Sequence, residues 1–350
     1  MNKKQSVFKN IINTGIPFVI MISLGIVILL SFVLSATPLK TIRYFFIGPF
    51  ENLYYFGNML NSAIPLVFGG LGISIAMTSD NFNLGGEGQV YSGAFTTTIV
   101  AVALAPLGIF GGFIALLAGA LLAGIIGGLS GYFKMKWSTS ELITSFLLSN
   151  AVVLIVNYLI TGPFLDSETN LLATRKVPEV MRLLKILPPS SLSTGAIYAV
   201  IAVFLVYMFM YKTRTGYELR VCGANPRFAA YGGLDIKKNM VLPMFISGAF
   251  YGLGGGLAIY GTFFSCMKEF HVGLGWNGLA VALIARFKPK AVIPAAIFFA
   301  WIGSGAKIAM QRCDVTLEIA SIVQAVVFFL ITCEVFQRNY FKKKEGISCN

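Results

Sequence analysis

Ten apolar runs, several of them short or interrupted by glycine, constrain the fold of this chain more than any other feature of its sequence. A helix needs about 20 consecutive apolar residues to cross the hydrocarbon core of a bilayer, and 350 residues leave room for about ten such helices. Only 12% of the residues are charged, against roughly a quarter in soluble proteins. The sequence predicts an all-α polytopic membrane protein, with spans at residues 16–36, 60–78, 90–107, 109–133, 142–160, 197–211, 241–264, 274–285, 291–308 and 319–336.

The distribution of positive charge predicts the orientation of the chain. Lys and Arg collect in the cytoplasmic loops of membrane proteins. With the N-terminus inside, the inner segments hold 18 of the 27 Lys and Arg residues and the outer segments hold nine. We therefore predict that both termini are cytoplasmic and that the first run is retained as a span. This bias explains the net charge of +13 without a nucleic-acid partner.

A polar, glycine-rich segment at residues 80–89 interrupts the apolar sequence. Polar groups cost several kcal/mol each in hydrocarbon unless they face protein or a water-filled cavity, so we expect a broken helix that lines an aqueous pathway. Asn81, Asn83 and Gln89 can donate and accept hydrogen bonds, and Phe82 offers a ring for stacking. These residues are candidates for holding a neutral polar ring compound. The alternative is that they satisfy an unwound backbone.

Glu87 lies within the same segment. A carboxylate at membrane depth is costly, and a functional role is the default interpretation. A helix that opens at Gly85-Gly86 would also leave amides exposed at its N-terminus, where Glu87 could cap them. We favour the capping interpretation and keep Glu87 among the candidates for the substrate path.

A second polar interruption lies at residues 266–278 and contains Phe270, Trp276 and Asn277. These three residues are further candidates for contact with substrate, although Trp276 also suits the aromatic belt at a membrane interface. Glycine-rich sequence precedes each interruption. Each interruption belongs to a set of four apolar runs, at residues 60–160 and 241–336, and the two sets are predicted to cross the membrane in opposite directions. This order predicts an inverted repeat with broken helices at matching positions.

The predicted organisation is a single membrane domain over residues 1–350. An extra N-terminal span and outer loop occupy residues 1–57, and the two repeats occupy residues 58–162 and 240–338. An outer loop covers residues 163–193 and a cytoplasmic loop covers residues 212–239. In the latter, Asn225-Pro226 is a typical helix start and Gly232-Gly233 a typical helix end. The capped helix of residues 226–231 suits a rigid contact with another protein.

Several motifs are absent from the full sequence. There is no GxxxxGK[ST] loop for phosphate, no HExxH and no GxSxG, which argues against an ATP site or a hydrolase. Five scattered cysteines and one histidine provide no metal site. We therefore predict no catalytic residue, no metal and no cofactor of its own. A carrier driven by an ion gradient is the alternative from another class, and a membrane-embedded enzyme or a channel would need a motif that is missing.

Residues 82–89 (FNLGGEGQ) resemble the FNIGxEGQ segment of bacterial ABC importer permeases in the branched-chain amino acid, ribose and nucleoside superfamily. Residues 216–220 (GYELR) and 223–233 (GANPRFAAYGG) resemble the cytoplasmic coupling region of these permeases, and residues 276–283 (WNGLAVAL) resemble a later segment. The resemblance implies coupling to ATPase subunits through Glu218, Arg220, Asn225, Pro226, Arg227, Ala230, Tyr231 and Gly232.

The resemblance also implies an assembly and a substrate class. An external substrate-binding lipoprotein would deliver substrate, and a second, different permease chain would complete the path as a heterodimer. Cytoplasmic ABC ATPases would bind ATP and Mg, and the complex would lie in the bacterial inner membrane. The form of the motif and the extra N-terminal span are most like the nucleoside branch, so we expect a purine nucleoside such as guanosine. Riboflavin and a ribose-type sugar stay open.

Overall fold

The computed structural model describes residues 25–33, 35–316, 318–319, 321–326 and 328–329. This part of the chain is helical and contains no strand, only two isolated bridges, as predicted for an all-α protein. It divides into two compact units, one of Met1–Met59 with Phe298–Asn350 and one of Leu60–Ile297. The predicted location of the two termini falls outside the described residues.

The smaller unit contains α3 (Pro38–Phe46), η1 (Gly48–Phe50) and the second half of α13 (Pro289–Arg312). The indole nitrogen of Trp301 donates a hydrogen bond of 3.1 Å to the carbonyl of Phe46. The Asp314 carboxylate accepts bonds from the Ser35 hydroxyl and the Ala36 amide, at 2.7 and 2.6 Å. These bonds lower the pKa of Asp314 below its ordinary value. They join the described N-terminal and C-terminal segments within this unit.

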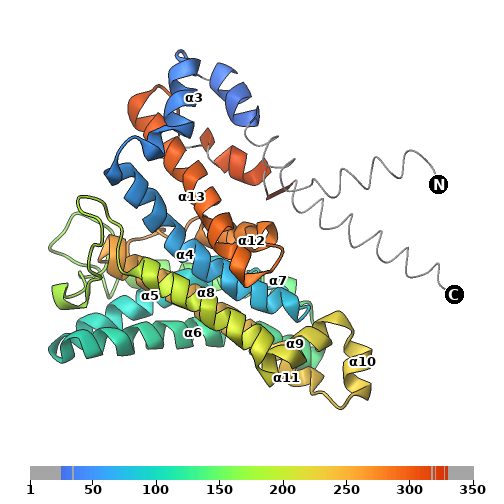
Figure 1. Cartoon of the computed structure of the whole chain (residues 1–350). Coiled ribbons are helices and arrows are strands. Elements are labelled where there is room, and N and C mark those ends of the chain that lie inside the picture. The colour runs from blue at the N-terminus through green and yellow to red at the C-terminus, as the bar shows by residue number, and fades with distance from the viewer. Residues whose placement is uncertain (1–24, 34, 317, 320, 327, 330–350) are drawn as a thin grey trace, which may run out of the picture. The chain divides into compact units, whose positions relative to one another are not determined.

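The larger unit contains the second part of α4 (Leu53–Thr78) and the first part of α13. Between them lie α5 (Gly86–Ala103), η2 (Ala105–Leu107), α6 (Gly108–Trp137), α7 (Glu141–Thr161), η3 (Glu179–Met181), α8 (Gly195–Lys212), α9 (Arg214–Ala224), α10 (Pro226–Tyr231), α11 (Ile236–Ala258), η4 (Ile259–Phe263) and α12 (Leu274–Ile284). In Figure 1 the loop after α7 lies at one end of this unit, and α9 and α10 lie at the other.

Helices α5, α6 and α11 form the centre of the larger unit, and small residues set their spacing. A Cβ added at Gly127 of α6 would lie 2.5 Å from the carbonyl oxygen of Met244 in α11. On α11, Gly248 packs in turn against the backbone of Ala123. Such close approach of backbones is the usual way in which membrane helices associate. Because α5 is enclosed by protein along most of its length, it can carry polar residues.

Six helices in the described part of the chain are long and apolar enough to cross a membrane: Leu53–Thr78, Ala105–Trp137, Glu141–Thr161, Gly195–Lys212, Ile236–Phe263 and Pro289–Arg312. The structure leaves the predicted count of ten unconfirmed. The runs at residues 16–36 and 319–336 lie largely outside the described residues. Two other runs correspond to α5, whose first turn is polar, and to α12, which has only 11 residues.

The same order of elements occurs twice in the chain. A long helix, an irregular segment, a shorter helix and another long helix follow one another as α4, residues 79–85, α5 and α6. They do so again as α11 with η4, residues 264–273, α12 and α13. This order matches the predicted repeat of elements, whereas the inversion of the two copies and their boundaries stay predictions.

Candidate functional site

The first break separates α4 from α5. Helix α4 ends at Thr78, Asp80 adopts a left-handed conformation with φ 56°, and residues 81–85 are irregular. Gly86–Gln89 already form the first turn of α5, so the irregular segment is shorter than the polar stretch in the sequence. The amide of Gly88 reaches the Ser149 hydroxyl at 2.8 Å. This bond occupies one of the amides that a helix start leaves free.

The side-chain amides of Asn83 and Gln89 pair with each other. The Nδ2 of Asn83 donates to the Gln89 Oε1 at 2.8 Å, and the Nε2 of Gln89 donates to the Asn83 Oδ1 at 3.0 Å. Asn83 Nδ2 also reaches the Ser247 hydroxyl of α11 at 3.0 Å, and Asn83 Oδ1 accepts from the Gly85 amide at 2.9 Å. Both side chains are buried. In this conformation they join the break to α11, and contact with substrate requires these bonds to rearrange.

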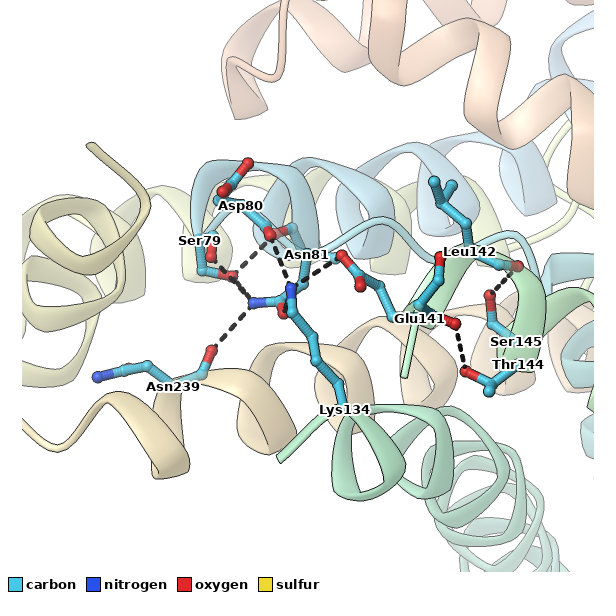
Figure 2. A network of polar contacts seen from close by, with 11 residues as sticks. Ser79, Asp80, Asn81, Lys134, Glu141, Leu142, Thr144, Ser145 and Asn239 are labelled. Atoms are coloured by element: carbon cyan, nitrogen blue, oxygen red, sulfur yellow. Dashed lines mark hydrogen bonds and ion pairs between the residues drawn. The ribbon is translucent and has the colours of Figure 1, made fainter. Parts of the chain in front are cut away.

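Asn81 belongs to a separate network at the end of α4 (Figure 2). Its Nδ2 donates to the Asn239 carbonyl at the start of α11, at 3.0 Å. Lys134, in the last turn of α6, donates to the Asn81 Oδ1 at 3.0 Å, to the Asp80 carbonyl at 3.2 Å and to the Glu141 carboxylate of α7 at 2.8 Å. Asn81 and Lys134 therefore tie four helices together at one point.

Glu87 caps a helix, but not the helix that the sequence predicted. Its Oε1 accepts hydrogen bonds from the amides of Gly275 and Trp276, at 3.1 and 3.3 Å. These amides belong to the first turn of α12, not to α5. The other oxygen, Oε2, is buried and has no hydrogen-bond partner among the described residues. These two hydrogen bonds anchor the start of α12 to Glu87.

The N-termini of α5 and α12 meet at Gly86 and Gly275. A Cβ added at Gly86 would lie 2.9 Å from the Cα of Gly275, and a Cβ at Gly275 would collide with the backbone of Gly86 and Glu87. The buried Tyr251 of α11 packs against this contact and donates to the Gly275 carbonyl at 2.9 Å. Only glycine permits this approach of the two backbones.

A small cleft lies beside this contact, lined by Asn83, Leu84, Gly86, Glu87, Tyr251, Gly275, Trp276 and Leu279. Its free volume of about 10 Å³ corresponds to roughly one water molecule. A nucleoside or a flavin does not fit in this cleft, and we call this arrangement of α5 and α12 closed. Of the predicted substrate-path residues, Asn83, Glu87 and Trp276 line this cleft.

The remaining predicted residues lie elsewhere. Phe270 packs against Tyr91 and Phe263, with ring centroids 5.8 and 5.4 Å apart. Phe82 and Asn277 are half-buried and do not line the cleft. Sequence reasoning missed Tyr251, although it directly precedes the glycine-rich segment of α11. It also missed Ser145 and Ser149 of α7, whose spacing of four residues places both hydroxyls on one face of the helix.

The predicted cytoplasmic helix is present as α10 (Pro226–Tyr231). The Asn225 side chain accepts a hydrogen bond from the Phe228 amide at 3.1 Å, as expected for an N-cap. Beyond the helix, Gly233 takes the left-handed conformation with φ 73°. Phe228, Arg227 and Tyr231 are exposed, Tyr231 to 94%. Two other predicted coupling residues have contacts within this chain: Glu218 pairs with Arg214 on α9, and Arg220 stacks on Tyr211.

Helix α9 connects this region with the first break. Gly223 of α9 packs against the carbonyl of Thr78 and lies close to Ser79, where α4 ends. Asn239 donates to the Cys222 sulfur at 3.2 Å, while its carbonyl accepts from Asn81. A displacement of α9 would therefore reach the break directly.

Comparison with known proteins identifies relatives over most of the chain. The family model for the permease component of branched-chain amino acid transport systems matches residues 55–332. A probable riboflavin import permease protein of Treponema pallidum (strain Nichols) is 33% identical over 329 residues, which cover 93% of this chain and 86% of the relative.

Two further relatives carry different substrates in their names. A guanosine ABC transporter permease protein of Bacillus subtilis (strain 168) is 29% identical over 290 residues, covering 81% of this chain and 82% of the relative. A glucose ABC transporter permease protein of Haloferax volcanii is 30% identical over 327 residues, covering 87% and 83%. The residues that match the family model, 55–332, include both breaks and helices α9 and α10.

Proposed function

This chain belongs to the family of branched-chain amino acid transport system permease components, and from that membership we propose that it forms half of the translocation path of an ATP-driven importer for a purine nucleoside such as guanosine. Members of this family are ABC transporter permease components and are not themselves enzymes. A carrier driven by an ion gradient is disfavoured by the same membership.

The meeting of α5 and α12 at Glu87 carries the proposal on the structural side. In transporters built from inverted repeats, substrate is handled where discontinuous helices begin, near the interface of the repeats. Here the two helix starts lie side by side, and amide, carboxylate and indole groups line the cleft between them. Such groups suit a flat ring compound with polar edges.

Transport requires the closed cleft to widen. Separation of Gly86 from Gly275 would break the two hydrogen bonds that Glu87 accepts from backbone amides of α12. The Glu87 carboxylate would then be free to accept hydrogen bonds from a substrate, and Trp276 could stack on a ring. We propose that ATPase subunits drive this change through α10, because α9 links α10 to the end of α4.

The proposed assembly contains cytoplasmic ATPase subunits that hold ATP and Mg, a second and different permease chain, and an external binding lipoprotein, in the inner membrane of a bacterium. Riboflavin is the second candidate substrate because a relative at 33% identity is a probable riboflavin import permease. A sugar is the third, given the glucose permease relative.

Purification of the tagged chain from its native membrane tests the assembly. We expect an ATP-binding subunit and a second permease chain to elute with it. An active preparation that lacks an ATPase subunit would refute the importer. Calorimetry of the cognate external binding protein with guanosine, ribose and riboflavin then decides the substrate, and the guanosine assignment fails if only another of these compounds binds.

A further inference from the structure

The loop between α7 and α8 is fastened to the second break. In Figure 1 the yellow-green loop lies against the orange end of α11 and η4. Backbone amides and carbonyls join the two segments at four places: Lys268 to Leu172 at 2.8 Å, Thr174 to Cys266 at 3.0 Å, Val177 to Phe264 at 2.7 Å and Leu183 to Tyr260 at 3.0 Å. We call residues 172–183 the outer strap.

Side chains strengthen this attachment. The Thr174 hydroxyl accepts a hydrogen bond from the Cys266 amide at 3.0 Å, so these two residues are joined twice. The guanidinium of Arg182 lies 4.9 Å from the centre of the Phe264 ring. Thr174, Val177 and Cys266 are buried. The inner edge of the outer strap is thus part of the packed structure.

The segment under the outer strap has an irregular backbone. It begins with the π-helical turn η4 and continues with two non-glycine residues in the left-handed conformation, Phe264 at φ 59° and Glu269 at φ 62°. Such conformations cost of order 1–3 kcal/mol and persist only where the surroundings impose them. The outer strap supplies those surroundings, because its bonds fall on Tyr260, Phe264, Cys266 and Lys268.

The same segment leads directly into the cleft. Residues 264–273 end at the first turn of α12, where Gly275 and Trp276 donate to Glu87. On the opposite face of the outer strap, Arg175, Lys176 and Val180 are exposed. A displacement of the outer strap would therefore reach the start of α12 through a single connected segment.

We propose that the outer strap is a positioning element, which holds the second break and the start of α12 in the closed arrangement, and that this attachment must loosen during transport. This rests on the proposed function, in which the contact of α5 with α12 opens to admit substrate. The first break has a corresponding attachment, where Gly223 of α9 packs on Thr78 and Asn239 holds Asn81. Each break is thus fastened to a different segment of the chain.

A reversible crosslink tests whether the outer strap must move. Ala173 and Met267 face each other in an isolated antiparallel bridge, and residues paired in this way have Cα atoms about 4.5–5.5 Å apart, within the range of a disulfide. The variant Ala173→Cys/Met267→Cys, in a chain whose native cysteines are replaced by alanine, closes this attachment upon oxidation. The control Lys185→Cys/Ser193→Cys uses the other isolated bridge, which lies within the loop and does not include the break.

Both variants are assembled with their partner subunits in proteoliposomes, and uptake of labelled guanosine and of riboflavin is measured with the cognate binding protein. Oxidation of Ala173→Cys/Met267→Cys should reduce uptake at least ten-fold and abolish stimulation of the ATPase by the binding protein, and dithiothreitol should restore both. The control should lose less than half of its uptake. Full uptake by the oxidised test variant overturns the proposal, whereas failure of the parent chain to import either compound refutes the proposed function instead.

Thiol labelling tests the attachment without transport. In a chain that keeps Cys266 alone, this buried thiol should react slowly with N-ethylmaleimide in isolated membranes. Replacement Thr174→Val removes one hydrogen bond to the break. The free energy that one hydrogen bond typically contributes is lost, and labelling should therefore be about five-fold faster. The control Thr169→Val lies in the same loop and bonds only within it, so its rate should equal that of the parent. Equal rates for all three chains would overturn the proposal.

Discussion

Glu87 shows how one side chain can set the distance between two helices. Its Oε1 accepts from two amides of α12 while its own backbone lies in the first turn of α5. Both helices present the positive ends of their dipoles at this point, and a carboxylate offsets them. The bond from each amide to a charged acceptor is also stronger than a bond to a neutral one. Glu87 therefore stabilises an arrangement of helix starts that would otherwise be unfavourable.

Two replacements of Glu87 should separate the contribution of its charge to stability from the contribution of its hydrogen bonds. In Glu87→Gln a carbonyl oxygen still accepts from Gly275 and Trp276, so we expect a loss of about 1 kcal/mol, whereas Glu87→Ala leaves both amides unpaired and should cost about 2–4 kcal/mol. Chemical denaturation in detergent measures both. Glu168→Gln, exposed on the loop between α7 and α8 but before the outer strap, is the control and should change stability little. An alanine variant as stable as the glutamine variant would contradict the cap.

The polar break itself could be read from the sequence, because eight of the ten residues at positions 80–89 are polar or glycine and stand out between apolar runs. The helix whose amides Glu87 caps could not be predicted from the sequence. Its partners lie 188 and 189 residues further along the chain, and nothing local distinguishes the amides of α12 from those of α5. The pairing of Asn83 with Gln89 was equally hidden, since either amide could as well have faced a ligand.

At the scale of elements, the break after α4 is held by Lys134. This ammonium group satisfies the Asp80 carbonyl, the Asn81 side chain and the Glu141 carboxylate together. The Lys134 and Glu141 side chains are 22% and 15% exposed, so water competes only partly for their bond. Loss of the lysine would remove the donor from three acceptors, two in the break after α4 and one on α7, of which the Asn81 and Glu141 oxygens are partly buried.

We expect Lys134→Met to destabilise the chain by about 1–3 kcal/mol, because an unpaired buried acceptor costs that amount. Lys136→Met is the matched control on the same helix turn; its ammonium lies over exposed rings of Tyr132 and Trp137 and should matter less. A double-mutant cycle with Glu141→Gln isolates the pair. A coupling energy of zero in that cycle would rule out the ion pair as a contributor.

Helix α10 could be predicted because its determinants are local: an Asn cap, a proline at its first position and a glycine after its end. The predicted role in coupling is untested and leads to a clear expectation. Tyr231→Ala and Arg227→Ala should each reduce uptake and stimulated ATP hydrolysis at least ten-fold without change in stability, since both side chains are exposed. Tyr198→Ala, exposed on α8 outside the predicted coupling region, is the control. Uptake at the parental rate in both α10 variants would refute the assignment.

At the scale of the whole molecule, the order of elements suggests a path with an attachment at each break. The first break is joined to α9 through Gly223 and Asn239, and the second is joined to the outer strap. Figure 1 places the loop and α9 at opposite ends of the larger unit. Both breaks lead to the same contact of α5 with α12. In the proposed transport cycle, that contact opens in response to a displacement of either attachment.

Gly275 tests whether the closed contact depends on backbone approach. A methyl group there would collide with the backbone at Gly86 and Glu87, and overpacking of this kind costs typically about 1–3 kcal/mol. We expect Gly275→Ala to lower the stability of the closed state and to raise amide exchange at the starts of α5 and α12 about ten-fold or more, since 1.4 kcal/mol corresponds to a factor of ten. Hydrogen–deuterium exchange with mass spectrometry measures this locally. The control is Gly303→Ala, where the nearest atom would lie at an ordinary 3.7 Å and the helix should become slightly more stable. If exchange at α5 and α12 is unchanged in Gly275→Ala while the protein stays folded, the two helix starts do not form the closed contact in solution.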